Sequence, residues 1–331
     1  MRTRTTLVAG AGVGVVVARR RGRNKPPAVY AGPLPVLSGT ARPVVTSDGV
    51  KLHVEVYGPV AAAATVVFAH GYVQSSRLWA RQVASLCAAR PDLRVVTYDH
   101  RGHGDSSLTS AAGATLAQLA LDLLVVLDEV APTGPIVLVG HSMGGMTLMA
   151  LADQHPELFG DRITGVSFVS TSSGQLEGLT YGLPKALAKV VSKQLPRANE
   201  AARKREAAGK APRKQPFLPA LLFGPGAPVD DIAVTLADMA RCPAASVADF
   251  HLTFGDHDRV AALAALSGVR TVVAVGTKDK LCPESHGRAI AAAVPHAELF
   301  VYPGAGHMLQ LERPAEVNSR LLALCEVLPR S

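Results

Sequence analysis

One pentapeptide constrains this chain more than any other stretch: Gly140-His141-Ser142-Met143-Gly144. It follows the apolar run 136–139 and precedes a segment rich in alanine, leucine and methionine, so it occupies a turn between a buried strand and a helix. In that context, Gly-x-Ser-x-Gly presents a serine hydroxyl on a sharp, strained turn, with the free N–H groups of the helix start aimed at it. The alternative is a glycine turn with a spectator serine, and the pentapeptide alone does not decide between the two.

The length of 331 residues is enough for one large core with an inserted subdomain. Its net charge of +8 is concentrated in two segments: residues 1–25 carry +7 and residues 197–214 carry +5, which leaves −4 for the remainder. Because the body is mildly acidic, the charge does not indicate a nucleic-acid surface. The four cysteines lack metal-ligand spacing, and we expect reduced thiols.

The N-terminal tail holds an apolar run, Leu7–Ala18, between basic residues. Twelve residues are too few to span a bilayer, which needs about 20. A basic cluster stands where a signal peptide would have its cleavage site. We expect a cytoplasmic protein or one peripheral to the membrane. For residues 1–25 an uncleaved anchor, an atypical signal segment and a disordered basic tail all remain open. The two basic segments either contact an anionic membrane or are simply solvated, and both interpretations remain equally open.

Alternation of strand-like and helix-like segments predicts a mainly parallel sheet covered on both faces. A hairpin signature surrounds Asp48-Gly49. We expect a tail and proline-rich linker over 1–42, a core over 43–173, a helical lid insertion over 174–262 and the rest of the core over 263–331. The expected strands are 65–69, 94–98, 136–139, 163–170, 270–275 and 298–302, and the expected helices are 77–89, 116–130, 284–293 and a last one from 314.

Three further motifs follow expected strands: His70-Gly71-Tyr72, the polar loop 99–106 and Gly304-Ala305-Gly306-His307. Together with the serine pentapeptide, this ordered set resembles the α/β-hydrolase superfamily, in its esterase/lipase-like branch with a lid. The resemblance covers about residues 43–330. It implies the α/β-hydrolase fold, with a mostly parallel eight-stranded sheet, helices on both faces and a helical lid.

The resemblance implies a catalytic triad in the chain order serine, acid, histidine. Among the histidines after Ser142, only His307 lies in a glycine-rich loop after the last strand, so we expect it to be the base. Asp279 follows the strand 270–275 and is the expected acid. The other known place for an acid, after the strand 163–170, offers no carboxylate.

The N–H groups of Tyr72 and Met143 are the expected oxyanion-hole donors. We expect Tyr72 and His141 to line the substrate pocket. A structural role at the site is expected for the remaining motif residues, which are His70, Gly71, Asp99, Gly140 and Gly144.

These expectations describe a serine hydrolase for a lipophilic carboxylic ester, with a small-molecule or lipid substrate and without metal or organic cofactor. A thioesterase, a C–C hydrolase and a cofactor-free haloperoxidase-like perhydrolase are alternatives, as is a non-catalytic ligand-binding or scaffold protein. The complete triad counts against the last of these. The sequence leaves open the acyl length, the alcohol group and the oligomeric state.

Overall fold

Alternate residues of the central strands point to opposite faces of the sheet, and both faces are apolar. In β6 (Thr65–Ala69), Val66 and Phe68 belong to one buried cluster, while Val67 and Ala69 belong to another. This period of two, with both positions buried, is what a covered parallel strand requires. The computed structural model describes residues 15–17, 32–176, 185–210 and 215–329.

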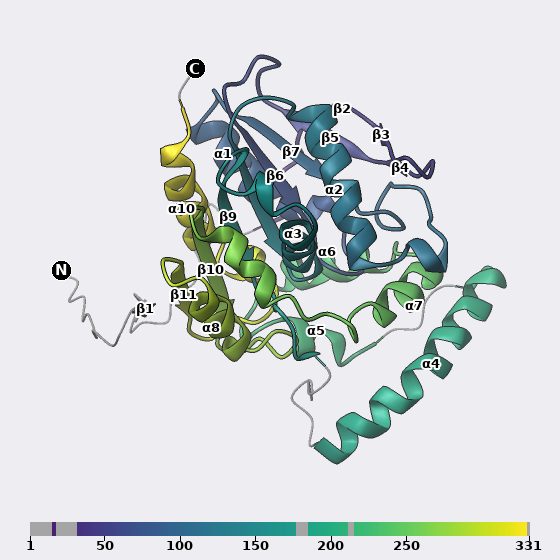
Figure 1. Cartoon of the computed structure of the whole chain (residues 1–331). Coiled ribbons are helices and arrows are strands. Elements are labelled where there is room, and N and C mark those ends of the chain that lie inside the picture. The colour runs from purple at the N-terminus through teal and green to yellow at the C-terminus, as the bar shows by residue number, and fades with distance from the viewer. Residues whose placement is uncertain (1–14, 18–31, 177–184, 211–214, 330–331) are drawn as a thin grey trace.

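The main sheet has nine strands in the described residues, in the order β1-β11-β10-β9-β8-β6-β7-β5-β2 (Figure 1). All neighbours pair in parallel except β2 with β5 and β5 with β7. The eight-stranded sheet of the expected fold is therefore confirmed, and the short strand β1 extends it at the β11 edge. The bounds are β1 Val15–Val17, β2 Thr40–Ala41, β5 Val54–Tyr57, β7 Arg94–Tyr98, β8 Ile136–His141, β9 Ile163–Val169, β10 Arg270–Gly276 and β11 Glu298–Tyr302.

The expected hairpin consists of β3 (Val44–Val45) and β4 (Lys51–Leu52), which pair antiparallel around the turn at Gly49. It forms a separate two-stranded sheet, because the strand after the turn is interrupted between β4 and β5. Thr40–Ala41 pairs with β5 and Val15–Val17 pairs with β11, so two short segments of the expected tail and linker belong to the sheet.

Helices cover the sheet on both faces (Figure 1). On one face α2 (Leu116–Val130), α3 (Met143–Gln154) and α8 (Glu284–Ala293) contribute to the larger buried cluster. On the other face α1 (Ala80–Ala89) and α10 (Pro314–Leu324) pack against the second cluster. Two short helices precede α1 and α10, namely the 3₁₀ turn Ser76–Trp79 and α9 (Leu309–Glu312).

The insertion between β9 and β10 is helical in its described part. It contains α4 (Lys185–Ala207), α5 (Leu218–Leu222), α6 (Val229–Met239) and α7 (Ala244–Leu252). Helix α4 extends along the outside of the molecule next to α7, to which an ion pair between Arg203 and Asp249 joins it (Figure 1). The next turn, Ala261–Leu266, leads back to the core. No described helix is long and apolar enough to cross a bilayer.

Candidate active site

The expected site residues follow four parallel strands, β6, β8, β10 and β11, at the same edge of the sheet. Residues 70–72 follow β6, Ser142 follows β8, Asp279 follows β10 and His307 follows β11. The carboxyl ends of parallel strands meet at one edge, which is where open α/β sheets place their sites. Residues separated by up to 237 positions in the chain are thereby brought to one region.

Ser142 has a backbone conformation that non-glycine residues rarely adopt. Its φ is 51° and its ψ is −118°, between the end of β8 and the start of α3. The turn is tight: a Cβ atom on Gly144 would lie 2.2 Å from the carbonyl oxygen of Ala69, so only glycine fits there. The Ser142 N–H donates to the carbonyl of Val169 at 3.0 Å, and Thr171 Oγ1 donates to the Ser142 carbonyl at 2.7 Å. Such strain persists where surrounding contacts fix it, and it is typical of functional residues.

Asp279 and His307 form a buried pair. Nδ1 of His307 lies 2.9 Å from Oδ2 and 3.1 Å from Oδ1 of Asp279, and both side chains are almost fully buried. The carboxylate also accepts the N–H groups of Leu281 and Cys282 at 2.9 and 2.8 Å. The aspartate is therefore oriented by the start of the following segment, and it in turn fixes one ring nitrogen of His307.

His141 links the serine turn to the His307 loop. Its Nε2 lies 2.9 Å from the His307 carbonyl oxygen, and the two imidazole rings are 4.8 Å apart. Burial lowers the pKa of His141 well below its usual value, so the ring is neutral and can donate from one nitrogen alone. That donor is Nε2, which leaves Nδ1 as an acceptor. His141 is fully buried with both nitrogens engaged, so it supports the site from behind and has no free polar atom for a substrate.

Gln74 completes this link, although no sequence motif pointed to it. Its side-chain amide lies 3.1 Å from Nδ1 of His141 and 3.3 Å from Sδ of Met308. Because Nδ1 is an acceptor, we assign the NH₂ end of the amide as its donor. The two ends of an amide have the same shape, so either end can face the ring. The residue is buried, and it joins the loop after β6 to the loops after β8 and β11.

The two expected oxyanion donors come from different segments, the start of α3 and the loop after β6. Met143 is the first residue of α3, so its N–H has no acceptor within the helix. Tyr72 lies in the loop after β6, whose Ala69 and His70 carbonyls approach Gly144 closely. The Tyr72 side chain turns toward the insertion, where its hydroxyl donates to the Val247 carbonyl of α7.

His70 and Asp99 have the contacts of bracing residues. His70 Nε2 accepts the His100 N–H at 2.9 Å, and its Nδ1 lies 2.7 Å from the Gly71 carbonyl. Asp99 accepts the N–H groups of Ser76 at 2.7 Å and Asp105 at 2.8 Å. These bonds hold the loop after β6 against the loop after β7.

Glu312 is a second support that the sequence did not reveal. This buried carboxylate accepts the Gly306 N–H at 2.9 Å, one residue before His307, and the Gly224 N–H of the insertion at 2.8 Å. Leu222, also in the insertion, accepts the N–H groups of His307 and Met308 at 2.8 and 3.2 Å. The position of Glu312 in the sequence does not reveal these contacts, because Gly224 comes from the insertion, 88 positions earlier.

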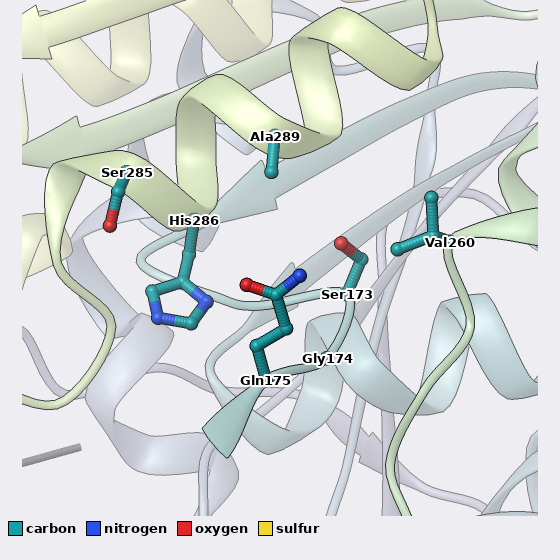
Figure 2. A pocket seen from close by; sticks show the side chains of 7 residues that line it. All are labelled: Ser173, Gly174, Gln175, Val260, Ser285, His286 and Ala289. Carbon is teal, nitrogen blue, oxygen red and sulfur yellow. The ribbon is translucent and has the colours of Figure 1, made fainter. Parts of the chain in front are cut away.

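A small cavity of about 70 Å³ lies where the insertion leaves the core (Figure 2). Ser285, His286 and Ala289 of α8 face the segment Ser173–Gln175 and Val260 across it. His286 Nδ1 lies 2.7 Å from Ser172 Oγ, and burial lowers the pKa of this histidine. Neither Tyr72 nor His141 lines this cavity, so it is not the expected substrate pocket.

The basic segments lie only partly within the described residues. The structure describes Val15–Val17 of residues 1–25, and it leaves residues 211–214 undescribed. On α4, Arg203 pairs with Asp249 and Lys204 lies 3.4 Å from Glu200, while Arg197 and Lys204 are exposed. Contact with an anionic membrane therefore stays a prediction. The four cysteines are free thiols, as expected.

The comparisons with known proteins agree with this fold. A family model described as alpha/beta hydrolase fold matches residues 64–314, and the chain therefore belongs to the α/β-hydrolase family. A thermophilic esterase from Thermogutta terrifontis, in a malate-bound structure, superimposes with a TM-score of 0.67 and 25% identity, over 86% of this chain and 97% of that one.

Two curated relatives match shorter parts of their own length. A dihydrolipoyllysine-residue acetyltransferase component of the acetoin cleaving system from Pseudomonas putida is 27% identical over 262 residues, 78% of this chain and 62% of the relative. Lipase LipV from Mycobacterium tuberculosis is 36% identical over 108 residues, 33% of this chain and 38% of the lipase. This chain thus spans less than two thirds of either relative.

Proposed function

We propose that this protein is a serine hydrolase that cleaves a lipophilic carboxylic ester through an acyl-enzyme on Ser142. One observation carries the proposal: a serine at φ 51° is joined, through His141, to the loop that holds the buried Asp279–His307 pair. A serine at a positive φ, linked to an oriented aspartate–histidine pair, supports the role of a nucleophile.

The reaction follows from the groups present. Ser142 Oγ attacks the ester carbonyl carbon, and Nε2 of His307 accepts the hydroxyl proton and passes it to the departing alkoxide. Asp279 holds Nδ1–H and stabilises the imidazolium. The Met143 and Tyr72 N–H groups stabilise the oxyanion, and water activated by the same imidazole then releases the acid.

Apolar side chains of the insertion favour a lipophilic acyl group. Leu222 and Phe223 pack with Leu78, Met308 and Leu311, next to the loops that carry Tyr72 and His307. The Tyr72 ring meets the Phe254 ring edge-on at 5.2 Å. The esterase and the lipase among the similar proteins support an ester substrate, and thioester, C–C and perhydrolase chemistry are the alternatives for the same serine.

A fluorophosphonate probe with peptide mapping tests the nucleophile, because only an activated serine reacts. We expect the label on Ser142 and no label on Ser142→Ala, whose hydrolysis of p-nitrophenyl esters falls by about 10⁴ or more. A series of acyl lengths, run beside the matching thioesters, then defines the substrate class. Normal turnover by a folded Ser142→Ala protein would remove the proposed mechanism.

A further inference from the structure

The loop after β6 contains another non-glycine residue with a positive φ. Val73, next to the proposed oxyanion donor Tyr72, has a φ of 60°. A β-branched residue in the left-handed region is a clear outlier that surrounding contacts must stabilise. Within the loop, the Gln74 N–H donates to the Gly71 carbonyl at a long 3.3 Å.

The insertion supplies contacts that stabilise this loop, through Asp238 of α6. Its Oδ2 accepts the Ser75 N–H at 2.8 Å, and its Oδ1 accepts the Ser75 hydroxyl at 2.6 Å. Asp238 is 8% exposed and 163 positions away from Ser75 in the sequence. Hydrogen bonds to a carboxylate are shorter and stronger than neutral ones, and here both arms of one carboxylate bind a single residue.

The other end of the loop is also bonded to the insertion. The Tyr72 hydroxyl donates to the Val247 carbonyl of α7. Tyr72 and Ser75 thus fix both ends of the strained segment to two helices of the insertion, while Gln74 fixes its middle to His141. The position of the Tyr72 N–H relative to Ser142 therefore depends on residues that come 96 or more positions after the serine.

We propose that Asp238 is a positioning residue, which acts through Ser75 to hold the Tyr72 N–H where it meets the oxyanion. The inference rests on the proposed function, since it assumes acyl transfer at Ser142. In this role the insertion is part of the catalytic framework, and α6 does not swing away from the loop during turnover. Loss of the carboxylate lets the 72–75 segment relax, which weakens oxyanion binding more than substrate binding.

Asp231 offers a matched control on the same helix. It is also a buried carboxylate, but its partner is Arg81 of α1, at 2.6 Å, and it has no bond to the 72–75 segment. Both sites would be changed to Asn and to Ala. The measurements are kcat and KM for p-nitrophenyl butyrate, the affinity for a trifluoromethyl ketone that forms a tetrahedral adduct, and Tm.

For Asp238→Ala we expect kcat to fall at least tenfold, the trifluoromethyl ketone to bind weaker by a similar factor, and KM to change less than threefold. Asp238→Asn keeps an acceptor oxygen and should recover part of kcat. Asp231→Asn should lower Tm with kcat within twofold of wild type. Adding Ser75→Ala to Asp238→Ala should lower kcat less than Ser75→Ala does alone.

Two results would overturn the inference. In the first, Asp238→Asn and Asp231→Asn, both folded, lower Tm alike and leave kcat alike, which makes Asp238 a stability contact. In the second, KM rises while kcat and ketone affinity stay constant, which makes it part of a binding surface. If Ser142→Ala is inactive, either result leaves the proposed function unaffected. An active Ser142→Ala would contradict both the proposed function and this inference.

Discussion

The amide of Gln74 lies 3.1 Å from Nδ1 of His141, and this contact joins the loop after β6 to the end of β8, next to the serine turn. Through the Nε2 of the same imidazole, the link continues to the carbonyl of His307. One buried, neutral histidine thus connects the three loops that carry the proposed chemistry, with one hydrogen bond at each of its ring nitrogens.

Gln74→Leu should lower kcat about tenfold, because it removes the donor to His141 and leaves a buried nitrogen without a partner. That loss costs about 1–3 kcal/mol in the free energy of unfolding. Gln82→Leu is the control: Gln82 is equally buried, but its amide donates to the Gln310 carbonyl at 2.9 Å, away from the serine turn. Steady-state kinetics and urea unfolding of both variants separate the effects. Equal kcat values for the two would contradict a linking role for Gln74.

Asp279→Asn should give a folded protein with kcat lowered by about 10⁴, since an amide neither stabilises the imidazolium nor selects the correct tautomer. The amide oxygen can still accept the Leu281 and Cys282 N–H groups, so Tm should change little. Kinetics and a thermal melt check both statements. A nearly normal kcat would mean that another carboxylate orients His307.

Ser142→Gly should be inactive and yet more stable than Ser142→Ala. Both variants lose the hydroxyl, but glycine adopts φ 51° without the clash that a Cβ atom meets. The relief of strain should raise the free energy of unfolding by about 1 kcal/mol relative to the alanine variant. Urea denaturation of the pair measures this difference, and a less stable glycine variant would show that the turn is not strained.

Stability should fall as the pH falls below 6.5, in part because of His103. Burial lowers the pKa of His103 from 6.5 to about 3. Between these values the unfolded chain binds a proton at this residue and the folded chain does not, so acid favours unfolding. The contribution approaches about 1.4 kcal/mol per pH unit. Urea unfolding at pH 7.5, 6.0 and 5.0 should show a smaller pH slope for His103→Gln than for wild type, and identical slopes would show that His103 does not contribute.

The sequence by itself determined the fold class and the region of the site. Continuous apolar runs in β6, β8 and β10 predict covered parallel strands, and the polar motifs follow those strands directly. Local spacing was informative because a strand, turn and helix that lie within a stretch of about ten residues depend on residues that are close in the sequence. The helix Leu116–Val130 and the turn at Ser142 are therefore found where they were expected.

Tertiary structure alone decided how the loops are held. Asp238 and Ser75, or Gln74 and Met308, are separated by 163 and 234 positions, and no local pattern marks either pair. His141 shows the same limit: its place beside the serine predicted a pocket residue, whereas its ring turns inward to the carbonyl of His307. The direction of a side chain depends on what packs against it. For these residues the partners lie in the insertion and near the last strand, far away in the sequence.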